Sequence, residues 1–411
     1  MNPLRLILSV FLSFILWQFL SQFFFCTQFK FTESPPFQGD SIYNPYASID
    51  PNKWMKCNFH AHANAWKGVT NGDGTARDVH RAYDSLNYQI HCVSNYHSID
   101  TSNQSKSNYI SAYEHDYNSL KTHQLVLGSK KVVWLDYILP QTLSNKQDVL
   151  NYLAQDPNSV IILNHPAMRK GYKEDDFLYL NNFNCMEVLN PAGTSFPQWD
   201  AALSAGKPIF IVGNDDIHNV IKKERLGRMC TFVNADSQSN FKVLNALKKG
   251  VSYGVEIGQT QHPDSIPTLQ QLTIINNTIS LQMSDKASKI TFIGQNGRNL
   301  LSISNTNKAQ YILQKGDHYA RAVISYSNGT SIYLNPVFFS QSGMISQSIV
   351  AIDFPMTIYN RFIGFCLAGG WLFWVCLYVQ KKKAIYITLP SIFKNPKKTK
   401  LWKRKKPAAL T

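Results

Sequence analysis

Histidine and acidic residues recur at the ends of apolar runs in the middle of this chain of 411 residues. His60 and His62 follow a run that begins at Cys57. On an extended strand, residues two apart point to the same side, so both imidazoles can bind one metal ion. Further residues that could bind a metal follow or flank later apolar runs, namely His97, Glu114, His123, His165, Asp215, Asp216 and His218.

The ligand types indicate a class of metal. Imidazole and carboxylate without thiolate suit zinc, manganese or iron(II). The set is too large for a single tetrahedral ion, so we expect two divalent ions that share a carboxylate, an arrangement that activates water for hydrolysis. No Cys-x-x-Cys pair occurs, which argues against a zinc ribbon. We expect four central cysteines to be free and buried in the core: Cys57, Cys92, Cys185 and Cys230.

The elements that must position these residues alternate between strands and helices. We expect strands at 57–60, 88–93, 124–127, 132–134, 160–163, 185–189, 208–212 and 229–232, and helices at 78–87, 145–156 and 240–249. This alternation is typical of an α/β fold with a parallel sheet, open or closed into a barrel. The carboxyl ends of parallel strands share one face, which is where active sites form. Beyond residue 261 the pattern changes to short alternating runs separated by turn residues, which predicts a small β-sandwich-like domain over 262–342.

Two apolar runs, at 6–25 and 362–379, are long enough to cross a bilayer. We expect an N-terminal transmembrane anchor over 1–26, because the run is followed by Phe23-Phe24-Phe25-Cys26 and not by the small residues of a signal-peptide cleavage site. A second transmembrane helix is expected over 358–380. The segment 381–411 holds eleven Lys or Arg residues and no acid, and it accounts for most of the net charge of +15. The positive-inside rule makes this basic tail cytoplasmic and places the region between the two helices outside the cytoplasm. We expect no nucleic-acid partner.

The motifs resemble those of the PHP (polymerase and histidinol phosphatase) family of metal-dependent phosphoesterases and related hydrolases, over about 54–258. The family's opening pattern is similar to His60-Ala61-His62 with Gly72-Asp73-Gly74, although Asn58 stands where the family has Asp. Its Thr-Asp-His is similar to Asn95-Tyr96-His97, with Tyr96 in place of the acid. The other motifs that match are Glu114, His123, His165-Pro166 and Asp216-Ile217-His218.

The resemblance implies a distorted (βα)7 barrel with up to three metal ions. One ion would be bound by His60, His62, Glu114 and Asp216. A second would share Glu114 and add His123 and His165. A third would use Asp73, His97 and His218. Within this set, the catalytic residues would be Glu114, Asp216 and His218.

We therefore expect a membrane-anchored, metal-dependent hydrolase, in first place a phosphoesterase that uses a metal-bridged hydroxide. The segment with Gly316-Asp317-His318 resembles the carbaryl-ester-hydrolase-like branch of the family, which keeps carboxylester, amide or carbamate hydrolysis as an alternative. A further alternative is a non-catalytic, metal-stabilised, membrane-tethered binding module. The substrate would be a small molecule or an ester derived from lipid or envelope. Asp215 is expected to orient a ligand, and three arginines either bind an anionic substrate or are solvated loop charges: Arg169, Arg225 and Arg228.

Overall fold

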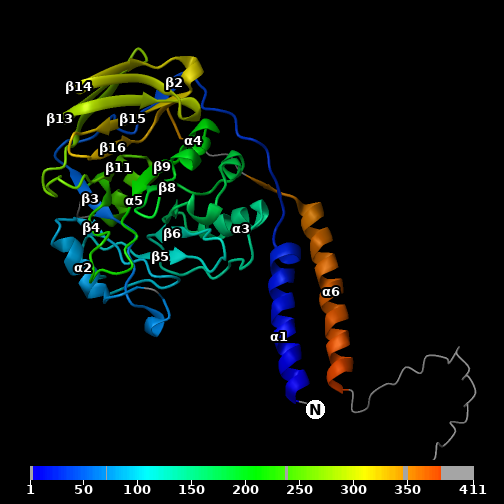
Figure 1. Ribbon diagram of the computed structural model, residues 1–411. Coiled ribbons are helices and arrows are strands. Elements are labelled where there is room, and N and C mark those ends of the chain that lie inside the picture. The colour runs from blue at the N-terminus through cyan, green and yellow to red at the C-terminus, as the bar shows by residue number, and fades with distance from the viewer. Residues whose placement is uncertain (1–2, 71, 237–238, 346–349, 381–411) are drawn as a thin grey trace, which may run out of the picture.

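The computed structural model describes residues 3–70, 72–236, 239–345 and 350–380 (Figure 1). The basic segment 381–411, which was predicted to be a cytoplasmic tail, lies outside these residues. The described chain forms a mixed α/β body from which a pair of long helices projects.

One of the two main sheets has five short strands. They lie in the order β5 (Ala112–His115), β6 (Gln124–Leu127), β7 (Val160–Leu163), β8 (Cys185–Leu189) and β9 (Phe210–Gly213). β6 is antiparallel to both of its neighbours, whereas β7, β8 and β9 are parallel. All residues of these strands are buried, as expected for strands covered on both faces. The helices α3 (Leu143–Leu153) and α4 (Phe196–Ser204) pack beside them.

The other main sheet has eleven strands and is almost entirely antiparallel. Its path runs β12 (Leu269–Ile275), β13 (Thr278–Ile293), β15 (Tyr319–Ser325), β16 (Ser331–Leu334), β11 (Ser252–Glu256), β10 (Met229–Asn234), β3 (Trp54–Asn58) and β4 (Ile90–His91). The other members are β14 (Asn299–Ile312), β17 (Val337–Ser340) and β2 (Ser41–Tyr43). Because β16 pairs with β11, the region predicted as a small β domain shares one sheet with the strands before it.

A closed parallel barrel, which the resemblance implied, is not seen among the described strands. No ladder of paired strands joins the two sheets among the described residues. They are linked by isolated bridges, such as Tyr96 with Glu114, and by the Thr231 hydroxyl on β10, which donates to the Gly213 carbonyl on β9 at 2.9 Å. The physical reason lies in the connections. The loop from β5 to β6 is too short for a crossover, which needs a dozen or more residues, so β6 returns antiparallel. β10 lies antiparallel to β3, and the segment 214–228 before it forms loops and turns with no helix.

The predicted helices form near their expected positions, as α2 (Ala76–Asp84), α3 and α5 (Asn240–Lys248). Thr75 begins α2 because its hydroxyl accepts a hydrogen bond from the amide of Asp78, whose carboxylate bonds back to the Thr75 amide. The prediction of a strand at 132–134 is wrong, because this segment is a loop. The four central cysteines are buried and free, as predicted.

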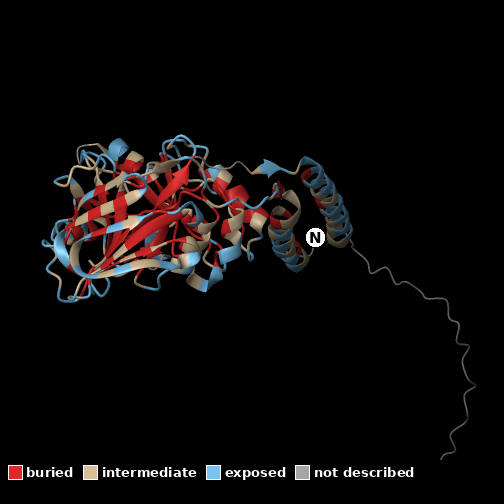
Figure 2. Cartoon of the chain, turned by 90° about the horizontal axis from the view of Figure 1, so that it is seen from above, coloured by how far each residue is buried: buried red, intermediate tan, exposed pale blue. Residues whose placement is uncertain are grey.

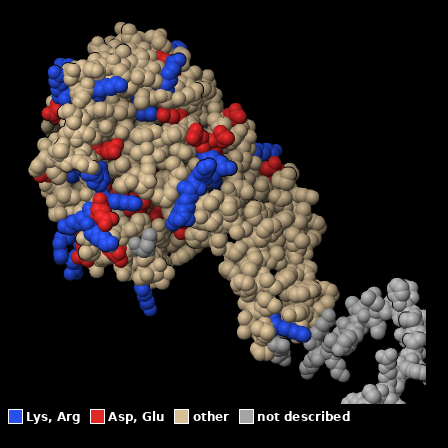
Figure 3. All heavy atoms as spheres, in the orientation of Figure 1, with Lys and Arg blue, Asp and Glu red and all other residues tan. Residues whose placement is uncertain are grey.

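The projecting helices are α1 (Pro3–Leu20), which continues into η1 (Ser21–Phe25), and α6 (Phe354–Gln380). They lie side by side and antiparallel (Figure 1), since the indole of Trp371 donates to the Ser13 hydroxyl at 2.8 Å and the rings of Phe25 and Phe365 lie 5.1 Å apart. Both helices are long and apolar enough to cross a membrane. Figure 2 shows that their side chains are mainly exposed, in contrast to the buried core of the α/β body, and Figure 3 shows their surface as largely uncharged.

The end of the first helix is fixed to the α/β body. Gln22 is buried, and its amide nitrogen donates to the carbonyl oxygens of Leu139 and Pro140, both at 3.0 Å. Its amide oxygen accepts from the Leu139 amide at 3.0 Å, and Asn145 at the start of α3 donates to the Gln22 carbonyl at 2.8 Å. Just beyond the helices, β1 (Phe29–Lys30) pairs with β18 (Ala351–Ile352). The first helix is therefore held to the body directly by Gln22, and the segment before α6 is held to the segment after the first helix by the pairing of β1 with β18.

Candidate metal centre

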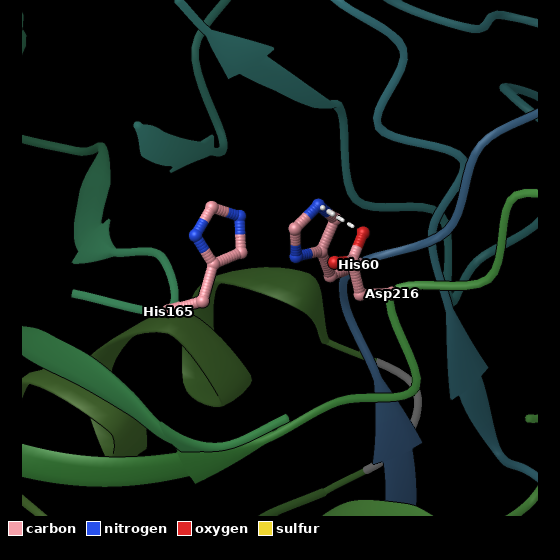
Figure 4. Close-up of side chains that lie close together, drawn as sticks. All are labelled: His60, His165 and Asp216. Atoms are coloured by element: carbon pink, nitrogen blue, oxygen red, sulfur yellow. Dashed lines mark ion pairs between the residues drawn. The ribbon is translucent and has the colours of Figure 1, made fainter. Parts of the chain in front are cut away.

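Four buried donor atoms converge between the two sheets, with the two imidazole nitrogens close to both carboxylate oxygens. They are Nε2 of His60, Nε2 of His62, Oε2 of Glu114 and Oδ1 of Asp216. Five of the six distances among them lie between 3.0 and 3.6 Å. Donors bound tetrahedrally to a zinc-sized ion at 2.0–2.1 Å lie about 3.3 Å apart. Figure 4 shows His60 and Asp216 facing each other, with His165 opposite them.

The two carboxylate oxygens of this group lack hydrogen bonds. Oε2 of Glu114 and Oδ1 of Asp216 are buried and have no hydrogen-bond partner among the described residues. Buried polar atoms are normally paired, because desolvation without a partner is costly. Since the unpaired oxygens are the ones that converge with the two imidazole nitrogens, this donor set fits a divalent cation.

A second group of donors shares Glu114. Its other oxygen, Oε1, lies 2.7 Å from Nδ1 of His123 and 3.4 Å from Nε2 of His165. These three atoms are close enough to bind a common ion. Glu114 thus presents one oxygen to each group, in the position of a carboxylate that bridges two ions.

Glu187 on β8 orients His60. Its Oε1 accepts from Nδ1 of His60 at 2.9 Å, so Nε2 is the ring nitrogen that faces the other donors and would bind an ion. Glu187 also accepts from the side chain of Asn214 at 3.0 Å, from the backbone amide of His165 at 3.1 Å and from the side chain of Asn190 at 3.0 Å. This single carboxylate therefore ties three of the surrounding loops to one position.

Asparagine side chains restrain the two ligand carboxylates. The Asn164 amide donates to Oε1 of Glu114 at 2.9 Å, and the Asn190 amide donates to Oδ2 of Asp216 at 3.1 Å. His165 and Asp216 have positive φ values of 29° and 46°, a left-handed conformation that costs non-glycine residues free energy. Such strain persists where the surrounding contacts fix the backbone, and here it turns both side chains toward the centre.

Burial and charge act in opposite directions on the titration of these groups. Burial lowers the pKa of His62 to about 4, which favours the neutral imidazole that a metal requires. Burial also opposes the charging of His60 and of His123, but nearby carboxylates outweigh it. They raise the pKa of His60 well above its usual range and that of His123 to about 9. Burial would raise the pKa of Glu114, but His123 and His60 hold it well below the usual range.

The side chains of the three residues implied for a third ion form no common donor group among the described residues, although the Asp73 amide donates to the His218 carbonyl at 2.7 Å. His218 joins His62 and Asp216, with Nε2 3.2 Å from Oδ1 of Asp216 and its ring stacked on His62 at 4.3 Å. Asp73 is exposed and accepts from the Asn219 side chain at 2.7 Å. His97 lies in a different group.

That group consists of His97, His115 and Asp136, and its hydrogen bonds resemble those of a structural cluster. Both ring nitrogens of His115 have acceptors, Gln124 Oε1 at 2.8 Å and the Leu135 carbonyl at 2.9 Å. Both oxygens of Asp136 accept hydrogen bonds, and burial raises the pKa of this carboxyl to about 7. The ring nitrogens of His115 and the oxygens of Asp136 therefore already have partners within the protein.

The predicted anion-binding arginines lie on loops. Arg169 and Arg225 are exposed and Arg228 is half-buried, and none of them forms an ion pair with another described residue. Asp215 is buried and accepts from the backbone amides of residues 227, 228 and 229 and from the Tyr83 hydroxyl. Burial raises the pKa of Asp215 to about 6 against these hydrogen bonds. Its side chain fixes the loop before β10 and does not bond to a ligand residue.

The comparisons with known proteins give a fold likeness of low similarity. No family model matches the chain, and no curated protein matches it significantly. One similar solved structure is a two-domain protein from Bacteroides vulgatus ATCC 8482, described as containing a predicted PHP-like metal-dependent phosphoesterase. The two chains are 12% identical with a TM-score of 0.39, and the match covers 76% of this chain and 100% of that one. Another is PsfC from Pseudomonas syringae PB-5123, with 13% identity, a TM-score of 0.33, and coverage of 47% of this chain and 87% of that one. At TM-scores this low, neither likeness establishes a family.

Three residues of the centre were not found from the sequence. Glu187 lies within an otherwise apolar strand, and a lone acid in a fully buried strand is the signal that could have identified it. Asp116 contacts Nε2 of His123, two residues beyond Glu114. The ammonium of Lys121 lies 5.6 Å from the ring centroid of Tyr96, which stacks on His62 at 4.7 Å. Lys121 depends on the fold of the loop from β5 to β6, so no pattern in the sequence indicates it.

Proposed function

We propose that this chain is a membrane-anchored, metal-dependent phosphoesterase of the PHP type with a two-ion centre. The observation that carries the proposal is Glu114, whose two oxygens face two separate groups of imidazole and carboxylate donors. Divalent ions held in this way lower the pKa of water and neutralise charge on a phosphoryl group. His60, His62 and Asp216 would hold one ion with Glu114, and His123 and His165 would hold the other.

The residues around the ligands have separate tasks in this proposal. Glu187 keeps the proton on Nδ1 of His60, so that Nε2 remains a ligand. His218 is the best candidate to move a proton, because its side chain is 26% exposed whereas those of His60 and Glu114 are fully buried. Lys121 supplies positive charge beside Tyr96 and His62, where it would bind a non-bridging oxygen of an anionic substrate.

The two exposed apolar helices support membrane anchoring, because a helix in the core of a soluble protein would be largely buried. The arrangement of the helix pair supports a position of the whole α/β body on one side of the membrane, because the first helix ends and α6 begins at the same end of the pair. With the basic segment 381–411 in the cytoplasm, the metal centre lies outside the cytoplasm.

The test uses the full chain purified in detergent, loaded with manganese or zinc, and assayed on aryl phosphodiesters, aryl phosphomonoesters and carboxylesters. Glu114→Gln removes the bridging charge, so we expect it to lower phosphoester turnover by orders of magnitude and to reduce the bound metal. Far-UV circular dichroism should stay unchanged. Glu256→Gln is the matched control, because Glu256 lies on β11 and bonds to Tyr333.

Three outcomes would contradict the proposal. Wild-type rates in Glu114→Gln would refute the bridging role of this residue. Turnover of carboxylesters alone would favour the ester, amide or carbamate hydrolase. Bound metal without turnover of any substrate would favour the non-catalytic binding module.

A further inference from the structure

Four exposed apolar side chains gather on the loops beside the metal centre. They are Trp66, Val69, Tyr117 and Trp134, with exposed fractions of 50%, 87%, 41% and 58%. We call them the aromatic rim. The rings of Trp66 and Trp134 lie 6.1 Å apart in an edge-to-face arrangement, and the Tyr117 hydroxyl donates to the Trp134 carbonyl at 2.7 Å. Exposed apolar side chains that form a contiguous patch usually mark a surface that contacts something.

The aromatic rim borders the metal centre directly. The indole nitrogen of Trp66 donates to the Tyr96 carbonyl at 2.7 Å, and the Tyr96 ring stacks on the ligand His62. On the other side, Trp134 stacks on His97 at 5.0 Å, and His97 accepts a hydrogen bond from the backbone amide of Asp116. A molecule that lies against the rim is thus one side chain away from the ligands.

The rim is also continuous with the attachment of the helix pair. Trp134 is five residues before Leu139, whose backbone bonds to Gln22 at the end of the first apolar helix. Five residues span at most about 18 Å, so the rim lies within that distance of the point where the chain leaves the helix. Figure 1 shows α3, which follows this loop in the chain, in the part of the body nearest to the helix pair.

The chemistry of the rim fits a lipid surface. Tryptophan and tyrosine favour the headgroup region of a bilayer, where the ring is partly buried and the polar atom stays hydrated. Lys130 and Lys131 are exposed on the same loop as Trp134 and would contact anionic headgroups. We infer that the aromatic rim lies in the headgroup region of the membrane that holds the helix pair, and that the metal centre acts on phosphoesters of amphiphiles in that membrane.

This inference rests on the proposed function and adds the substrate class. Hydrolysis would transfer a hydroxyl group from water to phosphorus and a proton to the leaving alkoxide oxygen, which breaks one phosphorus–oxygen bond. The apolar part of the substrate stays in the bilayer throughout. The enzyme would not have to extract the lipid, because the rim holds the centre at the depth of the headgroups.

The position of the rim can be measured without any turnover. The full chain is prepared with Val69→Cys in a background that also carries Cys366→Ser and Cys376→Ser, because the remaining cysteines are buried. A thiol-reactive fluorophore at position 69 is then tested in vesicles for quenching by nitroxide lipids labelled at the headgroup. We expect strong quenching at position 69 and none for the control, Ile275→Cys, whose exposed side chain lies on β12.

The substrate class is tested with two aryl phosphodiesters that share the reacting group. One carries a long alkyl chain and is embedded in vesicles of phosphatidylcholine and phosphatidylglycerol, and the other is a short-chain, water-soluble homologue. Val69→Glu should lower the ratio of the vesicle rate to the soluble rate by about tenfold, the effect of losing one apolar side chain from its contact. Ile275→Glu should leave this ratio unchanged.

The failures of the two proposals are distinguishable. No quenching at position 69, or an unchanged ratio in Val69→Glu, would overturn the inference even if the wild type hydrolyses both substrates. A wild type that hydrolyses only the soluble homologue would also overturn it. Failure to hydrolyse either substrate with metal bound would refute the proposed function, whereas quenching at position 69 would still support the membrane contact of the rim.

Discussion

Glu187 offers a sharp test of the centre because it binds no metal in our proposal and yet positions a ligand. In Glu187→Gln one carboxylate oxygen becomes an amide nitrogen, while the size of the side chain is kept. Each oxygen of Glu187 accepts two hydrogen bonds, one pair from His60 and Asn214 and the other from His165 and Asn190. Either orientation of the amide therefore places a donor against two other donors.

The magnitude follows from these contacts. If the amide nitrogen faces His60, the proton of His60 must move to Nε2, and this nitrogen can no longer bind a metal. If it faces His165, two buried donors lose their acceptor, at a cost of about 1–3 kcal/mol each. Because outer partners of metal ligands typically contribute 10–100-fold to affinity, we expect metal affinity to fall by about that factor. With the amide nitrogen facing His165, the free energy of unfolding of the metal-free protein should fall by about 2–6 kcal/mol, the sum for the two donors.

The assay is competition for zinc between the purified full chain and a chelating dye, combined with chemical denaturation of the metal-free protein. Glu256→Gln on the neighbouring part of the fold is the control and should change neither quantity. Zinc affinity in Glu187→Gln equal to that of the wild type would show that His60 does not depend on Glu187. It would refute our reasoning about the orientation of the ligand.

Of three further predictions, two concern residues around the metal centre and one concerns a remote lysine. Asp73 is exposed and accepts a hydrogen bond from Asn219, so Asp73→Asn should change phosphoester turnover by less than about twofold. A large loss of turnover would indicate that Asp73 binds a third ion. Lys121→Met should raise KM for an anionic phosphodiester by about tenfold, the size of a charge-assisted hydrogen bond, and leave KM for a neutral carboxylester unchanged; equal changes in both would remove Lys121 from substrate binding. Burial lowers the pKa of Lys207 from 10.5 to about 8, and its ammonium bonds only to Asn181 among the described residues. The folded state therefore disfavours the charged form, so stability should be reduced below about pH 8 and should rise toward pH 10.5. Lys207→Met should raise the free energy of unfolding near pH 7 by up to about 3 kcal/mol, and a gain that persists unchanged at pH 10.5 would contradict this cause.

The sequence predicted the position of most elements around the centre. Apolar runs such as 160–163 and 185–189 form strands, because short runs bounded by polar residues suit strands buried on both faces. The helix expected at 78–87 occurs as α2 at Ala76–Asp84, where Thr75 and Asp78 form a capping box that fixes its beginning. Ligands that directly follow such strands, His60 and His165 among them, were found for the same reason.

The sequence could not predict the way in which the strands pair. Neighbouring strands can be parallel or antiparallel with the same apolar pattern, and the outcome depends on the length and conformation of the connecting loops. For this reason a closed barrel was predicted, whereas the described chain forms two separate main sheets. The loop at 132–134 was expected to be a strand because Val132, Val133 and Trp134 are apolar, although Trp134 is exposed and packs on His97. Apolar residues selected for a surface contact cannot be distinguished from core residues by pattern alone.

Asn58 and Tyr96, which differ from the motifs that the sequence resembles, have defined contacts in the structure. Asn58 accepts from the Asp215 amide at 2.8 Å and donates to the His60 carbonyl at 3.1 Å, so it joins the backbones of two motifs. A carboxylate at this position could only accept, and the second bond would be lost. Tyr96 places an aromatic ring on His62 where the family pattern has an acid, and its backbone carbonyl holds Trp66 of the aromatic rim. In our proposal, Tyr96 thus extends the apolar surface from the metal centre to the aromatic rim.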